Sequence, residues 1–338
     1  MNKIIPIVLL LSLFLFSCNG QNKTTSTNSD KKESSSIDAL NSKIEQEPEN
    51  ATFYVQRAKI YQEADDLNHA IADIQMAINK DPNNTSYYLQ LADYFLATGQ
   101  MKNSIGVLKK VLTIQPKNIE ALLKMGEINL MIRKYHDVFT YANAVLENDP
   151  YNSKAFFMRG YTYKEMGDTT RAIENFRNCI KNDPAHYNAN VELALIYSVR
   201  KNAMAIDYFK NAIAIDSINE IAYYNLAMFY QNNDYLNEAL ETYRQLINLK
   251  PDFPYSYYNT GYIYMELLKV PDEAIPYFTQ AISINPSYYE AYFNRGLCYE
   301  ILGDVNNAKK DYMTALELHT NYAKAIEGLN RIDEIMSR

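Results

Sequence analysis

The stretch from Lys154 to Asn188, KAFFMRGYTYKEMGDTTRAIENFRNCIKNDPAHYN, carries the pattern that decides the fold of this chain. Imperfect copies of it recur along most of the sequence, and each copy ends on a proline or, in two cases, on a hydroxyl residue. Successive closing residues lie 34 positions apart, except for one step of 33 and one of 35. The closing residues are Pro48, Pro82, Pro116, Pro150, Pro184, Ser217, Pro251, Pro286 and Thr320.

A small residue stands in the first half of every copy, among apolar residues at spacings of 3 and 4. That spacing is typical of one face of a helix, and a small side chain lets a second helix approach closely. Each copy is therefore predicted to form two antiparallel amphipathic helices, and we expect the two indels to lie between them. The small residues are Ala58, Ala92, Gly126, Gly160, Ala194, Ala227, Gly261 and Gly296.

A period of 34 residues with this pattern resembles the tetratricopeptide repeat (TPR) family. The resemblance covers eight copies, from Ala51 to Thr320, and rests on aromatic residues at two places of the copy. Leu122 and Asn190 at the fourth place, and Asn129 at the eleventh, depart from it. The matching aromatics are Tyr54, Tyr88, Phe156, Tyr223, Tyr257 and Tyr292 at the fourth place, and Tyr61, Phe95, Tyr163, Tyr197, Tyr230, Tyr264 and Tyr299 at the eleventh.

The resemblance implies an all-α fold, an α-solenoid of about eight helix-turn-helix TPR repeats over residues 51–320. No copy can bury its apolar face alone, so each must stack on its neighbours, and we expect one elongated domain. Ile37, Leu40 and Ile44 share a helical face, which predicts an N-terminal capping helix over residues 37–48. Residues 321–338 are predicted to form the C-terminal capping helix.

The N-terminus has the pattern of a secretory signal over residues 1–17, with Lys3 before a short apolar run. The run is too short to span a bilayer comfortably. Leu15-Phe16-Ser17-Cys18 resembles a bacterial lipobox, which implies lipid attachment at Cys18; an ordinary signal peptide or a short anchor is the alternative. Asn19 after the cysteine favours the outer membrane, since this class often marks inner-membrane retention with an aspartate there.

Residues 18–36 are expected to form a lipidated, disordered tether, because after Cys18 they contain no aliphatic or aromatic residue. The repeats are then expected to be anchored near the membrane, facing the periplasm or the cell exterior. The formal net charge of −7 makes nucleic acid an unfavourable partner and argues against adhesion of the repeats to an anionic lipid surface.

The sequence shows no pattern of a catalytic, cofactor or metal site. The four histidines are scattered, and there is no Cys-x-x-Cys, phosphate-binding glycine loop or nucleophile turn. Cys179 and Cys298 are expected to be packing residues, too distant for a disulfide. We therefore expect no enzyme, no cofactor and no small-molecule substrate.

The TPR resemblance implies that the first helix of each copy lines a concave groove, through its fifth and ninth places among others. In copies four to eight these places are apolar or aromatic, which favours a protein or peptide groove. The alternative is that they pack against neighbouring helices. This candidate groove consists of Phe157, Tyr161, Val191, Leu195, Tyr224, Met228, Tyr258, Tyr262, Phe293 and Leu297.

Three asparagines, Asn225, Asn259 and Asn294, recur next to the groove positions and could form a polar ladder for a peptide backbone. Alanine at both Tyr258 and Tyr262 is predicted to weaken partner binding without unfolding the chain. Asp168-Thr169-Thr170 and Asp216-Ser217-Ile218 resemble a bacterial O-glycosylation signal, so Thr169 and Ser217 are candidate modification sites.

The sequence thus predicts a membrane-anchored scaffold or adaptor that binds protein or peptide partners in its groove. Two alternatives remain open. One is an accessory or regulatory subunit of an envelope enzyme, a protease or a peptidoglycan hydrolase. The other is a self-assembling structural subunit.

Overall fold

The computed structural model describes residues 29–337, with side chains from Ser36 onward. Over this range the chain forms eighteen α-helices and one π-helical segment, η1, and no strand. The predicted signal, Cys18 and the first part of the predicted tether lie outside the described residues. The helices are α1 (Ser29–Gln46), α2 (Ala51–Glu63), α3 (Leu67–Lys80), α4 (Thr85–Ala97), α5 (Met101–Ile114), α6 (Ile119–Met131), α7 (Tyr135–Asn148), α8 (Ser153–Glu165), α9 (Thr169–Asn182), α10 (Tyr187–Val199), α11 (Met204–Ile215), α12 (Glu220–Asn232), α13 (Leu236–Leu249), α14 (Pro254–Tyr262), η1 (Ile263–Leu267), α15 (Pro271–Ile284), α16 (Tyr289–Ile301), α17 (Val305–Leu318) and α18 (Ala323–Met336).

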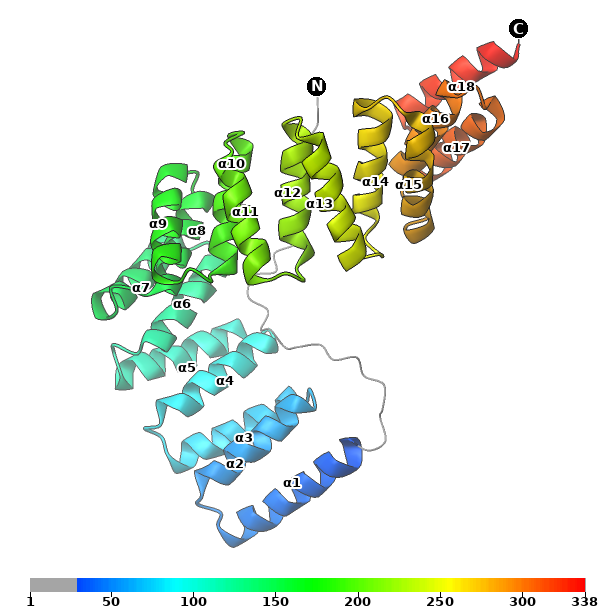
Figure 1. Ribbon diagram of the computed structural model, residues 1–338. Helices are drawn as coiled ribbons and strands as arrows, with labels where there is room; N and C mark the ends of the chain where they lie inside the picture. The colour runs from blue at the N-terminus through cyan, green and yellow to red at the C-terminus, as the bar shows by residue number, and fades with distance from the viewer. Residues whose placement is uncertain (1–28, 338) are drawn as a thin grey trace. The chain divides into compact units, whose positions relative to one another are not determined.

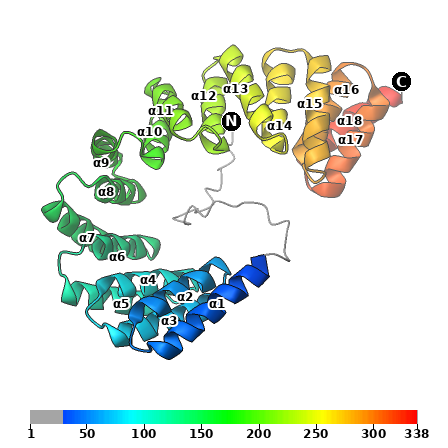
Figure 2. The same cartoon turned by 60° about the horizontal axis from the view of Figure 1, so that its bottom comes forward.

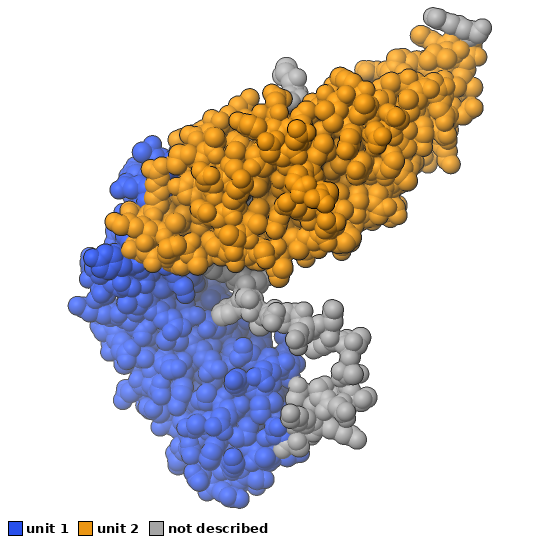
Figure 3. All heavy atoms as spheres, viewed as in Figure 1, with its two compact units in different colours: residues 1–175 blue, residues 176–338 orange. Residues whose placement is uncertain are grey.

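The helices pair as predicted. Copies one to eight are the pairs α2/α3, α4/α5, α6/α7, α8/α9, α10/α11, α12/α13, α14–η1/α15 and α16/α17. In the seven copies other than copy four, the two helices of the pair lie side by side (Figures 1 and 2). The chain divides into two compact units, residues 1–175 and 176–338, with the boundary inside α9 (Figure 3). Each unit is a stack of such pairs, which confirms the predicted α-solenoid.

The first helix of most copies begins at a side-chain cap two residues after the closing residue. The side-chain oxygen of each capping asparagine accepts a backbone N–H from the first turn of the helix. Closing proline and capping asparagine together end one copy and start the next. The caps are Asn50, Asn84, Asn118, Asn152 and Asn219, and the ring nitrogen of His186 takes the same role in copy five.

Tyrosines at the fourth place also stabilise the turn between consecutive copies. The hydroxyl of Tyr54 donates to the carbonyl oxygen of Pro48, and that of Tyr88 to Pro82, each over 3.1 Å. Leu122 and Asn190 occupy the fourth place in copies three and five and are buried. Neither has a phenol hydroxyl that could donate to the closing residue. The Oδ1 atom of Asn190 is buried without a hydrogen-bond partner among the described residues.

The turn between the two helices of a copy contains one residue with a left-handed backbone in every copy. Three of these residues are glycines, but five carry side chains, which adopt this conformation at a cost. The eight residues are Asp65, Gly99, Arg133, Gly167, Lys201, Asp234, Lys269 and Gly303, with φ between 51° and 81°.

The two indels are accommodated differently from the prediction. The extra residue of copy seven lies inside its first helix, because η1 widens the last turn and the link to α15 keeps its usual length. The prediction of an indel between the helices is therefore wrong for copy seven. In copy five the missing residue shortens the start of the second helix, since α11 has 12 residues where the other second helices have 14. α15 continues without a break through Pro276.

The small residues lie at close helix contacts, as predicted. A Cβ added to Gly296 would meet the ring of Tyr312 at 3.0 Å, and one added to Gly126 would meet the Met158 sulfur at 2.3 Å. Such distances leave no space for a side chain, so the small residue sets the helix spacing. Cys179 and Cys298 are both buried, and burial raises the pKa of Cys298 to about 12.

Helices α1 and α18 lie at the two ends of the described chain. Leu40 of α1 is buried against copy one, but the helix begins at Ser29, before the predicted boundary at Ile37, so part of the predicted disordered tether is helical. Ala325 and Ile332 of α18 are buried in a cluster with Tyr312 of copy eight. Between residues 29 and 337 no helix has the length and apolar character required to cross a bilayer.

Candidate functional site

All ten residues of the candidate groove lie on first helices, as the resemblance implied. Phe157 and Tyr161 belong to α8 in the first unit, and the other eight to α10, α12, α14 and α16 in the second. Every one is buried or half-buried. The structure therefore places the eight groove residues of the second unit on successive first helices and the two of the first unit on one helix, and each also packs within the fold.

The aromatic groove residues of the second unit are held by ring contacts. The ring of Tyr258 stacks on that of Tyr288 at 4.8 Å between centroids and meets Phe278 edge-on at 5.8 Å. Tyr224 meets Phe253 and Tyr255 edge-on at 5.5 and 6.4 Å. These offset and edge-on geometries are the favoured ones, so the rings have fixed orientations.

Two of the three predicted asparagines connect consecutive copies. The Nδ2 of Asn294 donates to the hydroxyl of Tyr258 over 2.9 Å, and the Nδ2 of Asn259 donates to that of Tyr224 over 3.3 Å. We call these pairs the Asn–Tyr rungs. Asn225 does not take part, since its Nδ2 donates to the Ile221 carbonyl oxygen of its own helix.

The rungs leave hydrogen-bonding capacity unused. Burial raises the pKa of Tyr258 and of Tyr224, so both hydroxyls stay protonated at neutral pH. Each hydroxyl accepts from an asparagine and keeps its own hydrogen to donate. Within residues 36–337, the Oδ1 atoms of Asn259 and Asn294 accept no hydrogen bond. Each rung therefore keeps one donor and one acceptor without a partner in the described chain, on asparagines that are buried at 8 % (Asn259) and 6 % (Asn294) exposure.

The last copy extends the aromatic row. Phe293 contacts Tyr312 at 5.6 Å and Tyr322 at 5.3 Å, and the ammonium of Lys324 lies 5.9 Å from its ring. Leu297 lies between this cluster and the one around Met265. Phe293 is therefore mainly a packing residue, whereas Leu297 is half-buried.

The prediction that alanine at Tyr258 and Tyr262 leaves the fold intact needs a correction. Its ring and hydroxyl contacts show that truncation to alanine would open a cavity, at a cost of about 3 kcal/mol. A double substitution at Tyr258 and Tyr262 would thus lower stability as well as binding. Sequence reasoning also missed Tyr255, which is 44 % exposed beside this row. The sequence feature that could have identified Tyr255 is its position at the second place of a first helix.

The first helices α4 and α6 of the first unit carry charged side chains. Lys124 pairs with Asp93 over 2.5 Å, and burial raises the pKa of that carboxyl despite the partner. Burial also raises the pKa of Glu127. At the fourth copy the surface becomes aromatic, with Phe157 and Tyr161 in ring contact at 6.2 Å and the Lys164 ammonium 4.1 Å from the Tyr161 ring.

Between Ser36 and Ser337, no three His, Cys, Asp or Glu side chains gather to hold a metal ion. Ser217 is exposed in the turn before α12, and Thr169 is half-exposed at the start of α9. Their modification stays a prediction.

Comparison with protein families identifies the repeats. Models described as tetratricopeptide repeat match residues 85–118, 153–186, 254–288 and 289–322, and one described as TPR repeat matches residues 228–267. The chain contains tetratricopeptide repeats. The matched segments correspond to TPR copies two, four, seven and eight, together with parts of copies six and seven.

One solved structure supports the TPR fold. The C-terminal part of a TPR repeat-containing protein from Cytophaga hutchinsonii superposes with a TM-score of 0.62 at 17 % identity, over 71 % of this chain and 99 % of that one. MamA is 27 % identical with a TM-score of 0.46, over 51 % of this chain and 94 % of MamA. The first likeness shows the fold alone.

Two curated Arabidopsis thaliana proteins share part of the sequence. The N-terminal acetyltransferase A complex auxiliary subunit NAA15 is 31 % identical over 121 residues, 36 % of this chain and 14 % of NAA15. Protein NPGR2 is 26 % identical over 112 residues, 31 % of this chain and 15 % of NPGR2. The chain thus spans only about a seventh of the length of these relatives.

Proposed function

We propose that this TPR protein is a non-catalytic binding subunit that holds an extended segment of another protein along the first helices of its second unit. The observation that carries the proposal is the pair of Asn–Tyr rungs. A peptide backbone has one N–H and one C=O per residue, so a donor and an acceptor on each rung match it. The aromatic groups beside the rungs supply apolar contact.

The geometry favours binding because the surface is organised before a partner arrives. The ring contacts of Tyr224 and Tyr258 fix both side chains, so little rotamer entropy is lost on binding. Tyr255 and Tyr262 keep part of their surface open. The partial match to an auxiliary subunit of an enzyme complex agrees with a subunit role.

Photocrosslinking in cells tests this proposal. A photoreactive residue at Tyr255 is expected to form a specific protein adduct, because this side chain is exposed beside the rungs. Met313 of α17 is the matched control, since it is 47 % exposed on a second helix of the same unit. Adducts of equal yield and identity from both positions, or none from Tyr255 in folded protein, would contradict the proposal.

We also propose that the subunit is a lipoprotein of the bacterial envelope, attached through Cys18 and directed to the outer membrane. The support is the lipobox-like Leu15-Phe16-Ser17-Cys18 and the Asn19 that follows. Labelling with an alkyne fatty acid is expected to mark the wild-type protein and not Cys18→Ser. Equal labelling of both, or recovery of wild-type protein in the soluble fraction, would refute the anchor.

A further inference from the structure

Arginine occurs at the place before the small residue in three copies. Arg57, Arg159 and Arg295 are the residues, in copies one, four and eight. Because the copies share one register, the surroundings of the three guanidinium groups can be compared directly. Two of them form ion pairs, and the third forms none with any residue that the structure describes.

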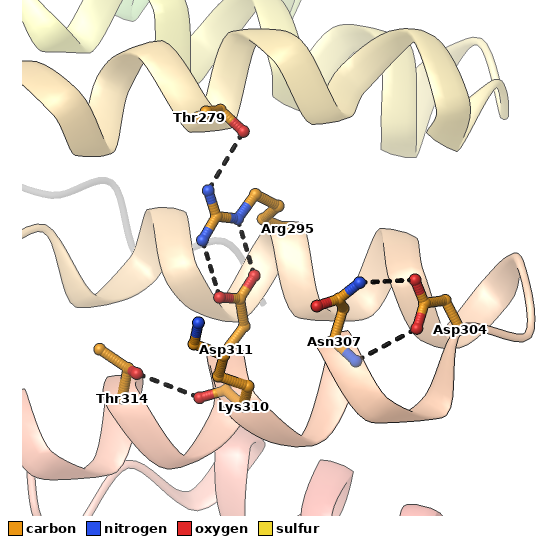
Figure 4. Close-up of polar contacts among 7 residues, drawn as sticks. All are labelled: Thr279, Arg295, Asp304, Asn307, Lys310, Asp311 and Thr314. Carbon is orange, nitrogen blue, oxygen red and sulfur yellow. Dashed lines mark hydrogen bonds and ion pairs between the residues drawn. The ribbon is translucent and has the colours of Figure 1, made fainter.

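In copies one and eight the arginine is neutralised by the same geometry. The Nε and Nη2 of Arg295 donate to the two carboxylate oxygens of Asp311 over 2.7 and 2.8 Å, and Nη1 donates to Thr279 over 3.1 Å (Figure 4). Arg57 makes the same fork with Asp73, at 2.7 and 2.6 Å. Both aspartates are almost fully buried and lie 16 residues after their arginine.

In copy four the carboxylate is missing. The residues 16 positions after and before Arg159 are Asn175 on α9 and Asn143 on α7. Asn175 is buried and donates its Nδ2 to the Arg171 carbonyl oxygen over 2.8 Å. Within the described part of the chain, Arg159 forms no hydrogen bond or ion pair; its Nε is shielded from solvent and its Nη atoms are open to it.

We call the surroundings of the Arg159 guanidinium a slot. This slot is rich in hydrogen-bond donors and poor in negative charge. The half-buried guanidinium has lost part of its hydration without gaining a counter-charge. Asn143 is exposed and occupies the register position that Thr279 holds beside Arg295, so it can add an amide N–H₂. A carboxylate arriving from outside can bond the two Nη atoms as an end-on fork, the geometry in which arginine recognises carboxylates strongly.

We propose that Arg159, Asn143 and Asn175 form a binding slot for an Asp or Glu side chain of a partner protein. The carboxylate class follows from copies one and eight, where the equivalent slot holds one. The asparagines of the slot belong to the second helices α7 and α9, whereas the candidate groove lies on first helices. It is therefore a second contact surface, independent of the Asn–Tyr rungs.

The first test follows the Arg159 Nε–H signal by NMR in the full chain while sodium acetate is added. Arg159 is expected to shift saturably, and Arg57 and Arg295 in the same sample are expected not to shift, because their slots are filled. Asn175→Asp supplies the carboxylate of copies one and eight internally and should abolish the acetate response. No saturable shift, an equal shift in Asn175→Asp, or a saturable response to inorganic phosphate alone would overturn the proposal.

A second readout covers the case in which Asn175→Asp does not fold. Acetate is expected to raise the melting temperature of the wild type saturably and to have no such effect on Arg159→Gln, which loses no internal bond. An equal increase in both proteins would overturn the slot.

Crosslinking identifies the source of the carboxylate. A photoreactive residue at Asn143 is expected to give a protein adduct in cells that is lost in Arg159→Gln, while the Tyr255 adduct remains. Acetate binding in vitro without any adduct at position 143 would overturn the protein partner in favour of a small carboxylate.

Discussion

At the scale of single residues, the fourth-place tyrosine links two consecutive copies. Tyr88 donates to the Pro82 carbonyl oxygen, which terminates the preceding copy. We predict that Tyr88→Phe lowers the free energy of unfolding by about 1 kcal/mol, the usual net value of one hydrogen bond. Urea unfolding measures this change. Tyr87→Phe is the control, since the Tyr87 hydroxyl makes no bond to any described residue; an equal loss there would contradict the interpretation.

A second residue-scale prediction concerns left-handed backbone. Lys201 holds φ at 51° and makes no ion pair within the described chain. Because glycine adopts this conformation without strain, Lys201→Gly is expected to raise the free energy of unfolding by about 0.5–1 kcal/mol. Lys201→Ala keeps the Cβ and should give no such gain. Denaturant midpoints of the two variants decide between strain and charge as the cause.

At the scale of elements, one acidic side chain attaches the C-terminal helix. Glu300 of α16 accepts from Arg331 of α18 over 2.6 and 2.8 Å and from the Tyr312 hydroxyl over 2.5 Å. Burial acts to raise the pKa of Glu300, but the bonds from Arg331 and Tyr312 outweigh it and lower the pKa below its usual value. The stabilisation is therefore present above the ordinary glutamate pKa and is lost as the pH falls through the lowered one.

We predict that acid releases α18 before the rest of copy eight. Amide exchange of residues 323–336 should accelerate as the pH falls below about 4 in the wild type, after correction for intrinsic rates. In Glu300→Gln the helix should be weaker by about 1 kcal/mol at neutral pH and should lose this pH dependence. Retention of the same pH profile in Glu300→Gln would show that another group is responsible.

At the scale of the whole chain, stability is a sum of neighbouring contacts. The helix pairs with extensive contacts are consecutive or next to consecutive in sequence. Leu108, fully buried between copies two and three, is one such contact. A change in one copy should therefore have local consequences.

Leu108→Ala tests this locality. We expect a loss of about 2–5 kcal/mol that appears as faster amide exchange in copies one to three, with copies seven and eight unaffected. Met313→Ala, at an exposed position, should change neither region. Uniform acceleration along the chain would mean that the repeats unfold as one cooperative unit.

Features that depend on local periodicity were readable from the sequence. The closing prolines, the small residues and the buried cysteines were assigned correctly because each copy repeats the same helix contacts. The candidate groove residues were placed on the right helices for the same reason. The start of α1 was missed because a polar segment carries no apolar period to reveal a helix.

Features that join residues across copies became visible only in the folded chain. The rung from Asn294 to Tyr258 spans 36 positions, and no spacing in the sequence distinguishes it from Asn225, which bonds its own helix. Likewise, the lack of a carboxylate partner for Arg159 among the described residues is recognised only by comparison with the contact between Arg295 and Asp311. Local period determines which helices form and where they pair, whereas side-chain partners depend on how adjacent copies stack, and only the tertiary structure shows this.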